Sequence, residues 1–197
     1  MGLDSVQLVI DIEDIFNIQI PDKECEQICT VEDFANIVKK YVVLYPNQEC
    51  LTQHVFYKLR RSFEMIGDSR NEILPNSVIS HLLPSCDLKY WWSVFQDELE
   101  LKIPLLHKTD LDKSINSTIN LFGVPILKRA KPITQNSLRI LIDWILVINH
   151  AQFINPLKVK NRYEIERVII GIIHTNCAVP IDEIFLRSEI CNDFGID

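Results

Sequence analysis

Residues 1–22, MGLDSVQLVIDIEDIFNIQIPD, are the stretch on which the fold of this chain depends. Val9, Ile12 and Phe16 recur at helical spacing with polar residues on the opposite side, so the stretch predicts an amphipathic helix. The helix is expected to end before Pro21, because the residue that precedes a proline disfavours the α region. A helix with one apolar stripe has to bury it against other elements of the fold.

Composition and charge narrow the fold class and the kind of partner. Glycine is scarce in the 197 residues, and β-branched residues do not alternate with polar ones over long runs, so an all-α fold is expected. Residues 1–50 hold ten acidic and three basic residues, which accounts for the whole net charge of −7. Such a segment repels nucleic acid and suits a basic protein partner, although a merely solvated acidic surface would look the same.

The remaining composition indicates a cytoplasmic protein that is not an enzyme. Asp4 follows Met1 closely, so no signal peptide is expected, and no apolar run is long enough to span a membrane. The six cysteines are expected to be reduced; Cys25 and Cys29 are one helical turn apart, but two thiols alone do not make a metal site. The five histidines are scattered, and the sequence contains no glycine-rich phosphate loop and no hydrolase or protease motif.

Several short motifs resemble the acyl carrier protein family. Residues 6–21, with VQLV, the Glu13–Asp14 pair, Phe16 and IQIP, are similar to the second helix of that fold, and TVEDF at residues 30–34 is similar to the start of its fourth helix. At the other end, SEICNDFGID at residues 188–197 resembles the first loop, which in the family leads into the serine that carries the prosthetic arm.

This resemblance implies a four-helix carrier bundle assembled from both ends of the chain, residues 1–45 together with 160–197. Carrier helices two to four come first in the sequence and helix one comes last, as in a circular permutation. Covering the exposed apolar stripe outweighs the closure penalty, which grows only logarithmically with the inserted length. Closure within one chain is therefore favoured, giving a monomer, with a domain-swapped dimer as the alternative.

A second, divergent carrier-like bundle is expected between these ends, over residues 50–156. WWSVFQDELELKIP at residues 91–104 parallels LVIDIEDIFNIQIP at residues 8–21, and residues 133–149 would complete the unit. Residues 105–132 form an insertion, with a helix expected near Thr109–Leu121. Trp91 and Trp92 are expected to fill the core of this second bundle.

The resemblance also implies a carrier serine, for which Ser5 and Ser85 are the candidates. Ser5 is closer to Phe16 than the family spacing, and that spacing places Gly2 at the carrier position. Ser5 also shares the apolar stripe, so it is expected to face the core. Ser85 lies 19 residues before Pro104, as Gly2 does before Pro21, but Pro84 stands where the family has an aspartate.

Three functions remain open from the sequence. The favoured one is a non-enzymatic carrier-like protein without a prosthetic group. It would bind basic partners, such as synthases or transferases of fatty-acid or polyketide-type metabolism, through the acidic helix face formed by Asp4, Gln7, Asp11 and Asp14. The second is a functional acyl carrier with 4'-phosphopantetheine on Ser5. The third is a bundle that binds lipid without a covalent link.

Overall fold

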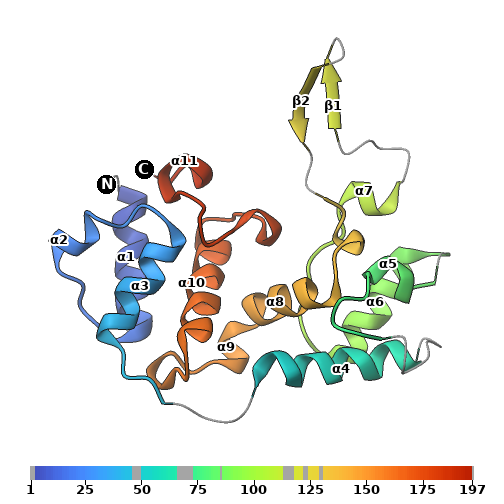
Figure 1. Ribbon diagram of the computed structural model, residues 1–197, viewed down its shortest axis with the longest axis horizontal. Helices are drawn as coiled ribbons and strands as arrows, with labels where there is room; N and C mark the ends of the chain where they lie inside the picture. Colours follow the sequence, from blue (N-terminus) through green and yellow to red (C-terminus); the bar gives the residue numbers. More distant parts are fainter. Residues whose placement is uncertain are drawn as a thin grey trace. The chain divides into compact units, whose positions relative to one another are not determined.

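The computed structural model describes residues 3–45, 50–65, 73–84, 86–112, 118–121, 124–128 and 131–196. These residues are mostly helical, which confirms the predicted fold class at that level (Figure 1). One exception is a two-stranded antiparallel hairpin, formed by β1 (Thr118–Leu121) and β2 (Val124–Lys128). The helix expected near Thr109–Leu121 was therefore wrong for Thr118–Leu121. The start of that range does lie in a short helix, α7 (Lys108–Leu111), and residues 113–117 lie outside the described residues. β-Branched residues are frequent in both strands, and Pro125 could not occupy a helix interior.

The chain divides into two compact units. The end unit combines Met1–Glu49 with Val147–Asp197, and the middle unit is Cys50–Leu146. The boundary between them falls inside helix α8 (Leu138–Ile148), whereas the sequence suggested a boundary near residues 156–160. The end unit thus contains segments from the two extremes of the sequence, which Figure 1 shows as blue and red helices side by side.

The end unit is built around α10, a helix that is buried on nearly all sides. Its elements are α1 (Leu3–Phe16), α2 (Asp22–Cys25), α3 (Val31–Tyr41), α9 (His150–Phe153), η2 (Pro156–Lys158), α10 (Arg162–Asn176), η3 (Ile181–Glu183) and α11 (Ile190–Phe194). α10 packs against α1, α3 and α9. The predicted stripe of α1, with Val9, Ile12 and Phe16, is buried in this core.

A capping box starts α3, as the TVEDF motif predicts. The Thr30 hydroxyl accepts a hydrogen bond from the Asp33 backbone N–H (3.1 Å), and the Asp33 carboxylate accepts one from the Thr30 N–H (2.9 Å). Partial burial opposes ionisation of Asp33, but the hydrogen bonds from Thr30 and from the Cys29 N–H outweigh it and hold the pKa of Asp33 below its ordinary value. The start of this helix is therefore defined by its own sequence.

The middle unit has its own apolar core. Its elements are α4 (Leu51–Met65), α5 (Ile79–Leu82), α6 (Leu88–Leu99), α7 (Lys108–Leu111), β1, β2, η1 (Ile133–Gln135) and most of α8. The rings of Phe63 and Phe95 lie 4.5 Å apart between α4 and α6. Trp92 is buried and donates from its indole N–H to the Pro104 carbonyl (3.0 Å).

Trp91 does not join that core, and the expectation for this residue was wrong. It is half-exposed and contacts the Tyr90 ring edge-on, with centroids 5.3 Å apart. Successive residues of an α-helix point about 100° apart, so only one of two adjacent tryptophans can face the core squarely.

Each unit contains the same arrangement of backbone hydrogen bonds between a loop and the start of a helix. In the end unit the loop follows α10 and the helix is α3. The three hydrogen bonds run from Ile190 N to Cys29 O (2.9 Å), from Val31 N to Ser188 O (3.3 Å) and from Glu32 N to Leu186 O (2.8 Å). In the middle unit they are Ile79 N to Asn136 O (3.0 Å), Leu138 N to Ser77 O (3.0 Å) and Arg139 N to Pro75 O (2.8 Å). We call these sets the end-unit clasp and the middle-unit clasp. The spacing of donors and acceptors is the same in both.

The turns that lead into the two clasps also match. The Ser188 hydroxyl accepts a hydrogen bond from the Phe185 N–H (3.2 Å), and the Ser77 hydroxyl accepts one from the Leu74 N–H (3.0 Å). After α1 and α6 the chain turns through left-handed residues, Asn17 (φ 50°) and Glu100 (φ 51°), and each is followed four residues later by a proline. The middle unit makes its clasp in chain order, whereas the end unit makes it between segments near opposite ends of the sequence.

Candidate functional site

The outer face of α1 carries the four polar residues that the sequence singled out. Asp4, Gln7 and Asp14 are exposed, and Asp11 is half-exposed. The Gln7 amide donates to one carboxylate oxygen of Asp11 (2.8 Å), and the Asn176 amide donates to the other (2.7 Å). Asp11 therefore links this face to α10, while Asp4 and Asp14 present their charges to solvent.

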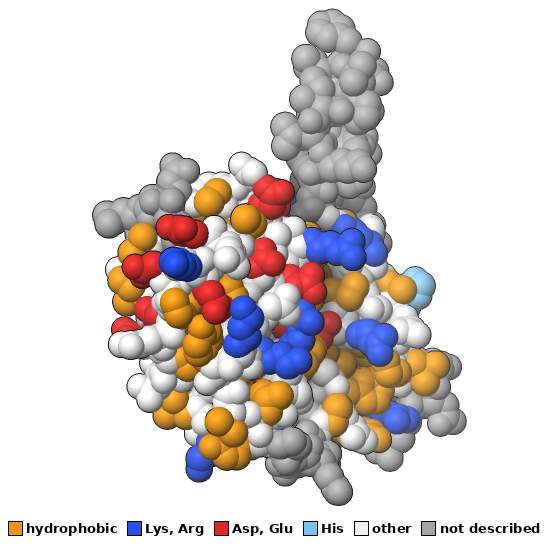
Figure 2. Space-filling model, turned by 60° about the vertical axis from the view of Figure 1, so that its left-hand side comes forward, with side chains coloured by type: hydrophobic (Ala, Val, Ile, Leu, Met, Phe, Trp, Pro, Cys, Tyr) orange, Lys and Arg blue, Asp and Glu red, His pale blue; other side chains and the backbone are white. Residues whose placement is uncertain are grey.

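Apolar side chains lie among these charges. Val6 and Ile10 are each about two-fifths exposed, at 42% and 41%. Figure 2 shows acidic and hydrophobic side chains exposed beside one another on the face that it presents. The end unit contains 17 Asp and Glu against 8 Lys and Arg, a net charge of −9, whereas the middle unit holds 10 against 12, a net charge of +2. The negative charge of the protein thus resides in the end unit.

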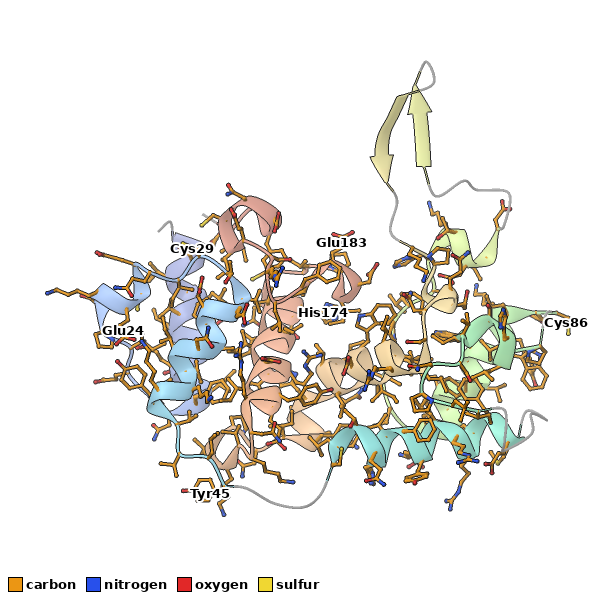
Figure 3. The ribbon with its side chains drawn as sticks, viewed as in Figure 1. Glu24, Cys29, Tyr45, Cys86, His174 and Glu183 are labelled. Carbon is orange, nitrogen blue, oxygen red and sulfur yellow. The ribbon has the colours of Figure 1, made fainter. Side chains whose placement is uncertain are left out.

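A groove of about 580 Å³ lies between α1 and α2. Its lining combines apolar residues with three carboxylates and one thiol, and consists of Val6, Val9, Ile10, Glu13, Ile20, Asp22, Cys25 and Glu26. Helix α2 is held beside α3 by Glu24, which accepts hydrogen bonds from Lys40 Nζ (2.8 Å) and the Tyr41 hydroxyl (2.9 Å). These hydrogen bonds, that of Lys40 first, lower the pKa of Glu24. Figure 3 shows Glu24 on this helix.

The thiol in this groove is not activated. Burial, reinforced by the nearby carboxylates of Glu13 and Asp22, raises the pKa of Cys25 above its ordinary value. The thiol hydrogen points to the Ile20 carbonyl, with a sulfur–oxygen distance of 3.6 Å. A protonated thiol is a poor nucleophile, so Cys25 is not poised for nucleophilic chemistry.

Ser5 lies on the inner side of α1 and is only 5% exposed. It precedes Val9 by one helical turn, on the side of the helix that faces the core, as expected from its spacing. A hydroxyl in this position cannot be reached by a modifying enzyme unless the N-terminal turn of the helix opens. Ser85 lies outside the described residues, between Pro84 and Cys86.

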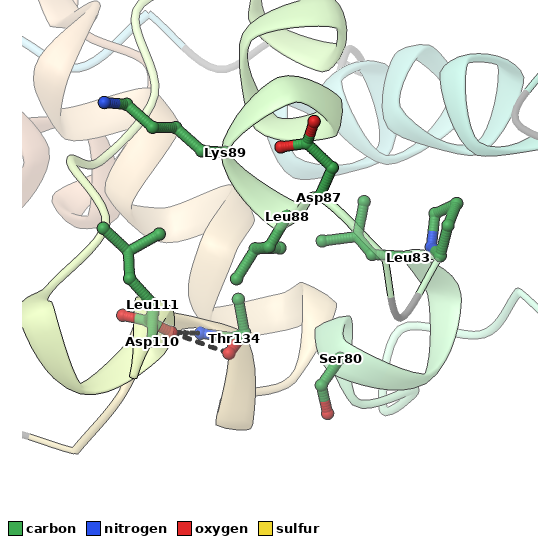
Figure 4. Close-up of a pocket in the computed structure, with 9 residues that line it drawn as sticks. Ser80, Leu83, Asp87, Leu88, Lys89, Asp110, Leu111 and Thr134 are labelled. Atoms are coloured by element: carbon green, nitrogen blue, oxygen red, sulfur yellow. Dashed lines mark hydrogen bonds between the residues drawn. The ribbon is translucent and has the colours of Figure 1, made fainter. Parts of the chain in front are cut away.

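A second cavity, of about 340 Å³, lies in the middle unit, and Figure 4 shows the residues that line it. Its walls combine apolar residues, Leu83, Leu88 and Leu111 among them, with polar ones such as Asp87 and Thr134. Asp110, at its edge, is buried, and both of its carboxylate oxygens accept hydrogen bonds. The donors are the Thr134 N–H (2.8 Å), the Thr134 hydroxyl (2.7 Å), the Ile133 N–H (3.0 Å) and the His107 N–H (3.0 Å). Asp110 therefore joins α7 to η1 across the hairpin that separates them in the chain.

Sequence reasoning missed Asp110. Its local signal was the capping-box position three residues after His107, at the start of a short helix. Its other partners follow it by 23 and 24 residues, and no periodic pattern connects them.

The part of the chain that the structure describes has neither a cluster of metal ligands nor a helix that could span a membrane. No group of three or more His, Cys, Asp or Glu side chains there is arranged to hold a metal ion. Among those same residues, no helix combines the length and the apolar character needed to cross a bilayer. All six cysteines are free thiols.

Comparison with known proteins identifies a similarity over part of the chain. Part of the chain resembles an acyl carrier protein. The acyl carrier protein of Buchnera aphidicola subsp. Baizongia pistaciae (strain Bp) is 45% identical over 41 residues, which cover 21% of this chain and 53% of that protein. The chain thus matches about half the length of this curated relative. No family model matches the chain, and no solved structure matches it. These findings support an acyl-carrier-like region within the chain.

Proposed function

We propose that this chain is a non-enzymatic, acyl-carrier-like protein that binds basic partner proteins through the acidic face of α1 and carries no prosthetic arm. The observation that carries the proposal is the contrast along one helix: Asp4 and Asp14 are exposed, whereas Ser5 is buried among core residues. The similarity to an acyl carrier protein supports the carrier-like part of the proposal. Partners of this class would be synthases or transferases of fatty-acid or polyketide-type metabolism, in the cytoplasm.

The proposal includes two carrier-like bundles, of which the end unit is circularly permuted. Three features that the two units share support it. They are the hydrogen bonds of the two clasps, the turns closed by Ser188 and Ser77, and the left-handed residues that follow α1 and α6. Under this proposal each helix of the end unit has a counterpart in the middle unit: α10 corresponds to α4, α11 to α5, α1 to α6, and α3 to α8. The β1–β2 hairpin then lies in the part of the middle unit that corresponds to the loop between α2 and α3 of the end unit.

The absence of a prosthetic arm is tested by mass spectrometry. The protein is co-expressed with a broad-specificity phosphopantetheinyl transferase, alongside a genuine acyl carrier protein as a positive control in the same cells. The intact mass of this chain is expected to stay unchanged while the control gains one arm, because the Ser5 hydroxyl is buried. A mass increase of one arm that disappears in Ser5→Ala would establish the alternative function, a carrier with 4'-phosphopantetheine on Ser5.

The docking surface is tested by charge reversal. Asp14→Lys is expected to weaken binding to a ketoacyl synthase with a basic docking surface by about fivefold to tenfold, since one exposed charge contact is worth up to about 1 kcal/mol and its reversal adds repulsion. Titration calorimetry at low and at physiological salt measures the effect, which salt should reduce.

Glu183→Lys provides the matched control for this test. It makes the same change of charge at an exposed position of the end unit, away from α1 on η3, where Figure 3 labels the residue. If both variants weaken binding equally, net charge rather than the α1 face governs the interaction, and the proposed surface is wrong.

A further inference from the structure

The C-terminal segment, residues 162–196, completes the end unit through contacts with residues near the other end of the sequence. The end-unit clasp joins it to residues 29–32, where Figure 3 labels Cys29. Two side-chain contacts accompany the clasp. Arg162 Nη2 lies 2.8 Å from Glu32 Oε1, and the Asn176 amide donates to Asp11. None of these contacts depends on the covalent path between the two segments.

The middle unit shows that this kind of docking occurs with a different chain connection. There the same three hydrogen bonds join α5 and its preceding loop to the start of α8 in sequence order. In the end unit the docking segment follows its partner in the sequence and is separated from it by a whole compact unit. Docking of a helix and loop onto the other helices is therefore independent of connectivity in this protein.

The ion pair between Arg162 and Glu32 favours docking of the C-terminal segment onto α3 over docking onto α8. α4 and α10 each contain 15 residues and begin 26 residues before the clasp serine, so Arg162 corresponds to Leu51. The clasps likewise align Glu32 with Arg139. Docking of the C-terminal segment onto α8 would set Arg162 against Arg139, whereas docking onto α3 sets it against Glu32. Like charges disfavour the first arrangement, and the second gains an ion pair.

We propose that residues 162–196 also complete the end unit of a second copy of this chain, giving a reciprocally swapped dimer in which Arg162 of each chain pairs with Glu32 of the other. The occupant that fits the α1–α3 surface is this segment, because it is the segment that the surface already binds. Val159 lies before the exchanged segment, so the hydrogen bond from Tyr45 N to Val159 O (2.9 Å) stays within each chain. Closure within one chain prevails in dilute solution, and the dimer becomes significant as concentration rises.

Two charge-reversal variants make the exchange observable. Glu32→Arg alone sets two guanidinium groups against each other at this contact. Arg162→Glu alone sets a new carboxylate against those of Glu32 and Glu166, because Arg162 Nε also pairs with Glu166 Oε1 (2.9 Å) within α10. When the two variants are unfolded together and refolded as an equimolar mixture at high concentration, exchange in a heterodimer brings opposite charges together. At one contact of the heterodimer, Arg162 of the first variant meets Glu32 of the second, as in the wild type. At the other contact the two substituted positions meet, with the charges reversed. Both wild-type side chains are more than a third exposed, at 36% and 41%, and Glu166 keeps Arg167 Nη2 at 3.9 Å when Arg162 is replaced, so neither substitution is expected to unfold the unit.

Native mass spectrometry and light scattering provide the measurement. The mixture is expected to give a heterodimer of twice the 22.9 kDa chain mass, enriched about tenfold over the dimer of either variant alone, because two like-charge contacts become two ion pairs. The double variant Glu32→Arg/Arg162→Glu restores the pair within one chain and should be as monomeric as the wild type. A mixture with no more dimer than its components, or a double variant that dimerises as strongly as the mixture, would overturn the proposal.

Discussion

Removal of residues 163–197 is expected to abolish the cooperative unfolding transition of the end unit and to leave that of the middle unit in place. The deletion removes most of α10, whose Ile165, Val168, Ile169 and Ile173 are fully buried. Burial of one large apolar side chain contributes about 1.5–3 kcal/mol, so the loss of these four alone is comparable to the whole stability of an ordinary small domain. It also uncovers the stripe of α1.

Hydrogen exchange measured by mass spectrometry, resolved by peptide, separates the two units. In the truncated chain, amides of α1 and α3 are expected to exchange at near-random-coil rates, whereas those of α4, α6 and α8 remain protected. Two point variants of the full chain provide matched controls. Ile169→Asp, at a fully buried site, should reproduce the loss, and Phe185→Ala, at a site that is 64% exposed, should not. Protection of α1 and α3 in the truncated chain would show that the N-terminal segment folds alone and would refute the permuted bundle.

Replacement of Asp110 by alanine is expected to destabilise the middle unit by about 3 kcal/mol or more. The carboxylate is 6% exposed and accepts hydrogen bonds from three backbone N–H groups and the Thr134 hydroxyl. Each buried donor that loses its partner costs about 1–3 kcal/mol, and water can reach only part of this site after the substitution. The connection between α7 and η1 is expected to open first.

Urea denaturation monitored by tryptophan fluorescence measures the change, because Trp92 is buried in the same unit. Asp110→Asn retains one acceptor oxygen and should lose about half as much stability. Asp97→Ala removes an exposed carboxylate from α6 and should stay within about 0.5 kcal/mol of the wild type. A loss of less than about 1 kcal/mol for Asp110→Ala would mean that Asp110 does not hold the two elements together.

The features that the sequence predicted correctly are those formed by neighbouring residues. The stripe of α1 follows from the 3.6-residue period, and the start of α3 follows from Thr30 and Asp33, which cap the helix locally. The orientation of Ser5 into the core follows from the same period. The acidic face of α1 was likewise evident, because it is the polar complement of that stripe.

The errors arose where local pattern was insufficient. Strand β1 replaced the second part of an expected helix, since strand propensity acts only when a partner strand, here β2, is present. Trp91 was assigned to the core because it adjoins Trp92, although the exact rotation of α6 decides which of the two is buried.

The sequence by itself determined the helical class, the cap of α3, the acidic face and the inward orientation of Ser5, because each depends on residues within a few turns of one another. Only the tertiary structure decided the hydrogen bonds of Asp110, the agreement of the two clasps and the pairing of Arg162 with Glu32. These contacts join residues that are far apart in the sequence, and their partners are selected by packing of whole elements, which no local pattern encodes. Residues 1–22 thus specify a helix and its two faces, and the fold selects α10 as the helix that covers the apolar one.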